Sequence, residues 1–207
     1  GLTETSPAAT INPLDLPEYN GAIGVPIPST EVALRDDAGK DVPLGQPGEI
    51  CIRGPQVMKG YWQRPDADAE VFVGEYLRTG DVATIDEDGY IRIVDRIKDM
   101  IAVGGFKVFP SQIEAVLYRH PDVKEALAIG IPDPYHGEVP KAFVTLADGA
   151  LTTADALKDW VNAQLGKHER VCAVEIRDSL PKTLVGKLSR KELVAEEKAK
   201  AAAGQSA

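Results

Sequence analysis

A lysine stands at the end of a short loop whose backbone is restricted. Residues 180–187 read Leu-Pro-Lys-Thr-Leu-Val-Gly-Lys, in which Pro181 fixes one backbone angle and Gly186 permits conformations that other residues avoid. The ammonium group of Lys187 is a compact positive charge on a flexible stem, suited to a place where a carboxylate meets a phosphate. Most loop lysines are simply solvated, and the loop alone leaves that alternative open.

Two further segments carry charged groups that suit a nucleotide. Asp81 ends the tight corner Thr79-Gly80-Asp81, and an ionised carboxylate can accept two hydrogen bonds from a vicinal diol. The guanidinium of Arg96 can reach a ribose oxygen and a phosphate together. Each has a plainer alternative: Asp81 as an ordinary turn residue, and Arg96 in a salt bridge with Asp95 or Asp99.

The composition argues against several classes of protein. With 207 residues, of which 43% are hydrophobic, the chain fits one or two soluble globular domains. Its formal net charge of −9 argues against a general nucleic-acid binder and against tight adhesion to anionic lipid. No apolar run approaches the roughly 18 residues that would span a bilayer. No signal peptide is visible, although a missing N-terminus could carry one, so we expect a cytoplasmic protein.

The cysteines and histidines do not predict a metal site. Cys51 and Cys172 are far apart, and each stands among alternating apolar residues, so we expect both to be reduced and buried in the core. His120, His136 and His168 are scattered without ligand spacing, and each adjoins a loop or a helix end.

The hydrophobic pattern changes near residue 98. Up to that point apolar and polar residues alternate between turns, which predicts strands, and residues 85–93 place an Asp-Gly turn between two apolar runs, which predicts a hairpin. Beyond it, helical and strand patterns mix. The sequence therefore predicts an α+β chain with a strand-rich part, residues 1–98, and a compact α+β part, residues 99–207.

Three helices and several strands are expected in the second part. Ser111 and Glu114 have the spacing of a capping box and predict that a helix opens there, and Ser189 and Glu192 repeat this spacing before the last helix. Apolar residues at helical spacing predict the middle helix at about 153–165. Strands are expected at 125–131, 141–147 and 173–178.

Five segments, in this order and at these separations, resemble the adenylate-forming superfamily of acyl-CoA synthetases, luciferases and peptide-synthetase adenylation domains. They are residues 1–5, 48–54, 76–81, 95–99 and 180–187. The resemblance covers nearly the whole chain. Within the superfamily the chain is most similar to a bacterial long-chain fatty acid–CoA ligase, through residues 45–49, 54–62 and 93–101.

The resemblance implies a fold and a reaction. Residues 1–98 would be the β-rich end of the large AMP-binding domain, and residues 99–207 the small mobile C-terminal domain. The parent enzyme would use ATP to convert a fatty acid into acyl-AMP and would then transfer the acyl group to CoA. ATP or AMP, Mg²⁺ and CoA are thus implied, and peripheral association of the parent with the inner membrane is an option.

The resemblance also assigns roles to single residues. Asp81 would bind the ribose hydroxyls of ATP, and Arg96 would contact the ribose side of the adenylate. Thr3 would lie near the phosphates and Glu4 would bind Mg²⁺, although at a chain terminus we expect both to be disordered. Lys187 would be the catalytic residue, because a positioned cation stabilises the charge that develops on the phosphoryl oxygens.

Two roles concern motion between the half-reactions. Lys98 would be the hinge between two domain orientations. Without the resemblance, Lys98 would be interpreted as a solvated lysine in a linker. Gly104 and Gly105 would line the pantetheine tunnel during the second half-reaction, because glycine lets a ligand approach the backbone closely; a plain β-turn is the alternative.

The chain begins in the middle of a motif, with Gly1 where relatives have the glycine of Tyr-Gly-x-Thr-Glu. We therefore expect the C-terminal part of a longer enzyme, inactive alone because the phosphate loop and most of the acyl pocket would lie upstream. Two other functions stay open: a non-catalytic nucleotide-binding or interaction module, and an adenylation domain that loads a carrier protein. Acyl-CoA formation on mixing with an N-terminal fragment of a relative would separate the module from the enzyme.

Overall fold

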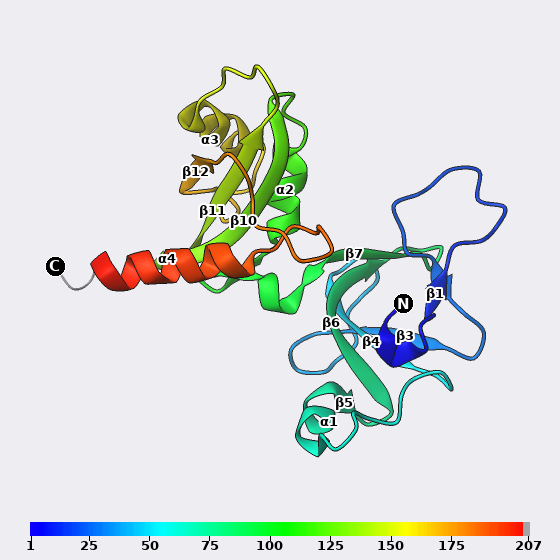
Figure 1. The fold of residues 1–207 in the computed structure, drawn as a ribbon. Helices are drawn as coiled ribbons and strands as arrows, with labels where there is room; N and C mark the ends of the chain where they lie inside the picture. The colour runs from blue at the N-terminus through cyan, green and yellow to red at the C-terminus, as the bar shows by residue number, and fades with distance from the viewer. Residues whose placement is uncertain (205–207) are drawn as a thin grey trace. The chain divides into compact units, whose positions relative to one another are not determined.

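The chain forms two compact units, Gly1–Lys98 and Asp99–Ala207 (Figure 1). The structure is a computed structural model, and it describes residues 1–204. Strands and helices are mixed in the chain, so the predicted α+β class is confirmed. No helix in the described part of the chain is long and apolar enough to cross a membrane.

An antiparallel five-stranded sheet builds the first unit. Its central strand, β6 (Tyr76–Ile85), pairs with β4 (Gly48–Arg53) along one edge and with both β5 (Phe72–Val73) and β7 (Ile91–Arg96) along the other. Strand β3 (Glu31–Arg35) pairs with the outer edge of β4. The hairpin predicted from the Asp-Gly turn is the connection between β6 and β7.

Alternation along these strands builds the core of the first unit. Ile50 and Ile52 of β4 face the same side, as residues two apart in a strand must, and they pack with Leu34, Ala83 and Ile91 in one buried cluster. The smaller elements of this unit are β1 (Thr10–Ile11) paired with β2 (Val25–Pro26), the short helix α1 (Pro65–Val71), and the 3₁₀ turns η1 (Thr3–Thr5) and η2 (Ile97–Asp99).

A second five-stranded sheet forms the centre of the second unit. Strands β10 (Val123–Asp133) and β11 (Gly137–Leu146) form a long hairpin. β10 extends beyond the predicted strand 125–131 at both ends, whereas β11 begins four residues before the predicted strand 141–147 and ends one residue before its end. β11 also pairs with β8 (Ile101–Val103), which pairs with β9 (Phe106–Val108), and β12 (Ala173–Ile176) lies parallel to β11.

Both faces of this sheet are buried. Ala126 and Ala128 of β10 belong to the cluster with residues of α2 (Pro110–Leu117) and α3 (Ala154–Asn162), whereas Leu127 and Ile129 belong to a second cluster. That second cluster includes Leu193 of α4 (Lys191–Gly204) and Leu180, which precedes the lysine loop. Burial on both faces explains why this strand reads as an almost continuous apolar run.

The helix boundaries correct three predictions. Helix α2 begins at Pro110, one residue before the predicted opening, because proline suits the first helical position. Residue 109, a phenylalanine, is the N-cap without a side-chain bond, so Ser111 and Glu114 do not form a capping box. Helix α4 begins at Lys191, directly after Arg190, so Ser189 is not its N-cap either. Helix α3 begins at Ala154 after its N-cap Thr153, close to the predicted start at about 153, but it ends at Asn162, before 165.

One of the two cysteines is not in the core. Both thiols are free, and Cys51 is buried as expected, but Cys172 is exposed. Cys172 lies just before β12, and its backbone N–H bonds to the carbonyl of Pro140. Its neighbour Val171 is buried instead, so Cys172 faces away from the core.

Glu114 instead joins an ion cluster inside the second unit. Arg190 donates to both its carboxylate oxygens at 2.7 Å and reaches Asp99 at 3.2 Å, and Glu114 also accepts the backbone N–H of Ala128 at 2.8 Å. The cluster joins the beginning of the second unit to the residue before α4.

This cluster should stabilise the second unit measurably. We expect Glu114→Gln to lower the free energy of unfolding by about 2 kcal/mol, because the substitution removes the charge to which Arg190 donates in a largely buried place. The matched control is Glu192→Gln, the exposed glutamate of the other predicted capping box, which should cost less than about 0.5 kcal/mol. Urea unfolding followed by circular dichroism measures both, and equal losses would contradict the assignment.

Candidate active site

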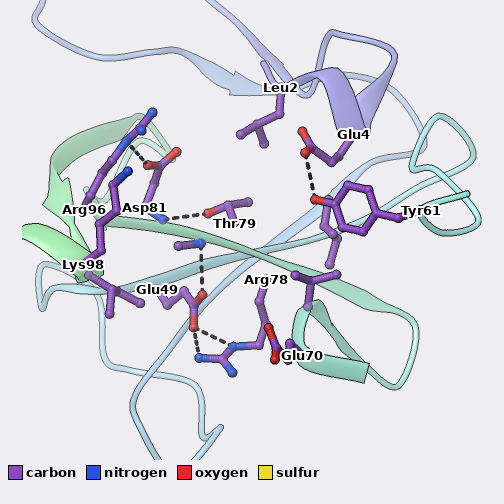
Figure 2. Close-up of a pocket in the computed structure, with 14 residues that line it drawn as sticks. Leu2, Glu4, Glu49, Tyr61, Glu70, Arg78, Thr79, Asp81, Arg96 and Lys98 are labelled. Carbon is purple, nitrogen blue, oxygen red and sulfur yellow. Dashed lines mark hydrogen bonds and ion pairs between the residues drawn. The ribbon is translucent and has the colours of Figure 1, made fainter. Parts of the chain in front are cut away.

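The candidate site is an open cavity of about 520 Å³ in the first unit (Figure 2). This volume falls within the range of small-molecule and cofactor sites. Its walls come from the N-terminal turn, from β4 and β6, and from the end of β7. The residues that line it are Leu2, Glu4, Glu49, Tyr61, Glu70, Val71, Leu77, Arg78, Thr79, Gly80, Asp81, Arg96, Ile97 and Lys98.

The two residues predicted to hold ribose lie side by side. Asp81 and Arg96 are direct partners in the register of β6 and β7, and Arg96 Nε lies 3.2 Å from Asp81 Oδ1. The Asp81 side chain is 18% exposed and that of Arg96 is 58% exposed. The alternative was a salt bridge of Arg96 with Asp95 or Asp99. Asp95 accepts the backbone N–H of Arg96 at 2.8 Å and Asp99 pairs with Arg190, whereas the Arg96 guanidinium pairs with Asp81. Hydrogen-bond acceptors and donors therefore stand together at one wall of the cavity.

The corner before Asp81 is held by side chains. Gly80 has a positive φ of 73°, which favours glycine, and its N–H donates to Glu49 Oε1 at 3.1 Å. The Thr79 hydroxyl accepts the N–H of Asp81 at 3.1 Å and donates to the carbonyl of Ile50 at 2.9 Å. Arg78 donates to Glu49 through Nε at 2.8 Å, and this bond raises the pKa of Arg78 above its usual value.

The N-terminal turn is ordered, contrary to the prediction for Thr3 and Glu4. They open the 3₁₀ turn η1, whose last residue, Thr5, is buried and donates to the carbonyl of Pro7 at 2.7 Å. Glu4 lines the cavity and accepts a hydrogen bond from the Tyr61 hydroxyl at 2.9 Å, which raises the pKa of Tyr61. Thr3 is exposed and is not among the lining residues.

Lys98 lines the cavity and is the last residue of the first unit. It lies in η2, directly after β7, and is exposed. The site thus brings together Glu4, Asp81, Arg96 and Lys98 of the predicted residues, whereas Lys187, Gly104 and Gly105 belong to the second unit.

The loop that carries Lys187 has a hydrogen-bonded base. Lys182 and Leu188 form an isolated bridge, and Thr183 donates its N–H to the carbonyl of Lys187 at 2.7 Å. Gly186, with φ of +80°, closes the turn through a bond to the carbonyl of Thr183. Lys182 Nζ lies 2.5 Å from Glu125 Oε1, whereas Lys187 has no carboxylate within 4 Å in the described part of the chain. Among residues 1–204 the Lys187 ammonium therefore has no carboxylate partner, and the residue is exposed.

Gly104 and Gly105 form the two-residue turn between β8 and β9. Their φ values of 57° and 88° are both positive, as a type I′ hairpin turn requires. Gly104 donates its N–H to the carbonyl of His136 at 2.8 Å. A β-turn is thus sufficient to explain both glycines, and a role toward CoA remains a prediction.

Among the lining residues that were not predicted to take part are three with polar side chains, Glu49, Tyr61 and Arg78. All three stand in segments that carried the resemblance. A buried glutamate beside a cavity is the signal that could have found Glu49, but burial was not visible in the sequence. The contacts of Tyr61 and Arg78 depend on which strands and turns are neighbours.

Comparison with known families gives matches in both units. The AMP-binding enzyme family matches residues 1–62, and the AMP-binding enzyme C-terminal domain matches residues 112–187. The chain belongs to the AMP-binding enzyme family. The long-chain-fatty-acid–CoA ligase of Yersinia pestis is 53% identical over 95% of this chain and 35% of its own length. The long-chain-fatty-acid–CoA ligase of Escherichia coli O6:H1 is 50% identical over 97% of this chain and 36% of its own length.

The chain thus spans about a third of the length of the curated AMP-binding enzymes that it matches. Solved structures agree with this fold. ATP-bound MatB from Rhodopseudomonas palustris matches with a TM-score of 0.89 and 34% identity over 95% of this chain and 39% of MatB. An anthranilate CoA ligase in complex with anthranoyl-AMP matches with a TM-score of 0.85 and 33% identity over 98% of this chain and 40% of that ligase. Apo MatB from Rhodopseudomonas palustris matches with a TM-score of 0.68 and 35% identity over 95% of this chain and 39% of that chain.

The two loop lysines should differ in reactivity. In limited labelling with an amine-specific acylating reagent, Lys187 should be modified several-fold faster than Lys182, because the carboxylate of Glu125 shields the Lys182 ammonium. Mass spectrometry of the digested protein measures both rates in one sample. Glu125→Gln should raise the rate at Lys182 and leave Lys187 unchanged. Equal rates in the unaltered chain would contradict the described loop.

Proposed function

We propose that the protein containing this chain is an ATP-dependent fatty acid–CoA ligase. It would convert a fatty acid and ATP into acyl-AMP and pyrophosphate, and then acyl-AMP and CoA into acyl-CoA and AMP. The observation that carries the proposal is the Asp81–Arg96 pair at the wall of a nucleotide-sized cavity. The names of relatives at 50% and 53% identity support the fatty acid and CoA as substrates.

The nucleotide would bind at this wall. Asp81 Oδ2 is free of the Arg96 contact at Oδ1 and can accept from ribose hydroxyls, while Arg96, which is more exposed, can donate to a ribose oxygen or a phosphate. Thr3 would lie near the phosphates. Its exposure leaves its hydroxyl accessible, although it does not line the cavity.

The site fits Mg²⁺ only if the protein and ATP both supply ligands to the ion. Glu4 offers one carboxylate toward the cavity, with Tyr61 donating to one of its oxygens. No group of three potential ligand side chains occurs among residues 1–204. Mg²⁺ is commonly held by one or two carboxylates together with waters and substrate phosphates, so Glu4 would hold the ion with the help of ATP. When bound, the ion would neutralise charge on the phosphates.

Lys187 would act in the first half-reaction. Adenylation brings an anionic carboxylate against an anionic α-phosphate, and charge accumulates on the phosphoryl oxygens. A positioned ammonium offsets the repulsion and stabilises that charge. Its support here is the hydrogen-bonded loop and the absence of a competing carboxylate near Lys187 in the described residues.

The second half-reaction would need a different arrangement. We propose that residues 1–98 are the end of the large AMP-binding domain, that residues 99–207 are the small C-terminal domain, and that Lys98 is the hinge between them. Gly104 and Gly105 would then line the pantetheine tunnel of CoA. The division of the chain into two compact units after Lys98 supports this proposal. A cytoplasmic location with peripheral membrane contact stays a prediction from sequence.

Replacing Lys187 should separate the two half-reactions. In the full-length enzyme we expect Lys187→Ala to lower carboxylate-dependent ATP–pyrophosphate exchange about 100-fold or more, because a charge matched to the transition state is lost. Transfer from supplied acyl-AMP to CoA should change only a few-fold. Lys182→Ala, in the same loop, is the matched control and should spare both. Equal losses in both half-reactions would exclude a specific role in adenylation.

Proline at position 98 should impair the second half-reaction and spare the first. Lys98→Pro removes a backbone donor, fixes φ near −65° and restricts the preceding residue. We expect ATP–pyrophosphate exchange to persist while transfer of the acyl group to CoA slows at least about tenfold. Lys98→Ala should do little, because the backbone carries the pivot. Unimpaired CoA transfer in the proline variant would leave Lys98 a solvated linker lysine.

A further inference from the structure

Glu49 is a buried carboxylate beside the cavity for which the proposed reaction has no direct use. It lies in β4, is 8% exposed, and lines the cavity together with Arg78, Gly80 and Asp81. Its Oε2 accepts from Arg78 Nε and Nη2, each at 2.8 Å, and its Oε1 accepts the N–H of Gly80 at 3.1 Å. Both oxygens thus act as acceptors, as those of an ionised carboxylate do.

Next to Glu49 the regular pairing of β4 with β6 is interrupted. Glu49 is opposite Val82 and Cys51 is opposite Arg78, so three residues of β6 stand where β4 has only Ile50. Extra residues of this kind form a bulge, which bends the strand and redirects a side chain. Here the bulge is Thr79-Gly80-Asp81, and its last residue is the one proposed to bind ribose.

Side chains complete the hydrogen bonds of this bulge. The Gly80 N–H is bound by Glu49, and the Asp81 N–H is bound by the Thr79 hydroxyl. Gly80 also adopts the left-handed region, which no neighbouring strand enforces by pairing. The charge of Glu49 is itself held by Arg78, whose side chain is 44% exposed and reaches the cavity. Glu49 and Thr79 thus both hold the bulge, and the carboxylate of Glu49 is itself anchored by its ion pair with Arg78 (Figure 2).

We propose that Glu49 is a positioning residue of the nucleotide site, whose carboxylate holds the Thr79-Gly80-Asp81 bulge so that Asp81 faces the ribose hydroxyls. The inference rests on the proposed function. It assigns Glu49 no contact with ATP: its effect reaches the nucleotide through Asp81. Loss of Glu49 should therefore weaken the recognition of the ribose hydroxyls rather than catalysis in general.

The deciding experiment compares ATP with 2′-deoxyATP and 3′-deoxyATP in carboxylate-dependent ATP–pyrophosphate exchange by the full-length enzyme. Unaltered enzyme should prefer ATP at least about tenfold in kcat/KM, since each hydroxyl donates to a charged group. Glu49→Gln keeps the shape of the side chain but presents an amide to Arg78. It should lower kcat/KM for ATP about tenfold and lower it less for either deoxy nucleotide, because each of these keeps only one of the two hydroxyls. The preference for ATP should therefore shrink while KM for the fatty acid is unchanged.

Two more variants make the result specific. Glu31→Gln changes a carboxylate of the neighbouring strand β3 that pairs with Arg53 and does not contact the bulge, and it should keep the preference for ATP. Arg78→Met removes the partner of Glu49 at a half-exposed position and should reduce the preference as Glu49→Gln does. If circular dichroism shows that Glu49→Gln does not fold, Arg78→Met decides the question.

The outcomes separate this inference from the function on which it rests. Equal loss with all three nucleotides in Glu49→Gln, with the preference for ATP intact, would overturn the positioning role. An unaltered enzyme that adenylates fatty acid without preferring ATP would overturn the ribose role of Asp81 and this inference with it, but not the ligase. No fatty-acid-dependent exchange at all in the unaltered enzyme would overturn the proposed function.

Discussion

Strand β6 must satisfy its backbone hydrogen bonds on both edges, and this constraint places most of the candidate site. β4 runs along one edge, while β5 and β7 share the other. Because β7 pairs with the second half of β6, Arg96 arrives opposite Asp81. Because β4 has only Ile50 opposite three residues of β6, Thr79, Gly80 and Asp81, β6 bulges there. The acceptor, the donor and the bulge that aims the acceptor thus follow from one set of strand pairs.

In the second unit the corresponding constraint is a sheet that is covered on both faces. Alanines of β10 allow α2 and α3 to approach one face, and larger residues fill the other against α4. Leu180 is buried in that second cluster, and Lys182 is paired with Glu125, so the lysine loop leaves the domain from a fixed base. Leu184 and Val185 at its tip are exposed. A rigid base with a solvated tip suits a charge that must be presented at a defined place.

Local patterns were enough to predict the strands, the Asp-Gly hairpin and the α+β class. The resemblance singled out Asp81 and Arg96, which the structure places side by side, and their roles toward ribose stay predictions. Contacts between distant segments were not predictable. Glu49 and Gly80 are 31 residues apart and meet through strand register, and Glu114 and Arg190, 76 residues apart, meet through helix packing. The capping box at Ser111 failed for a local reason: Pro110 suits the first helical position, so the helix begins before the serine could cap it.

The distribution of ion pairs explains how an acidic chain can serve anionic substrates. Most of the cations near the functional segments are already bound: Arg78 by Glu49, Lys182 by Glu125, and Arg190 by Glu114 and Asp99. These hold structure, since breaking them would leave a carboxylate without its partner. Arg96 differs, because its side chain is 58% exposed although its Nε lies 3.2 Å from Asp81 Oδ1, so its guanidinium is accessible to a ligand. Lys187 differs further, because no carboxylate in the described chain has to be displaced before its charge can meet an anion. A net charge of −9 is therefore compatible with phosphate chemistry, since what matters is which cations remain available rather than how many the chain contains.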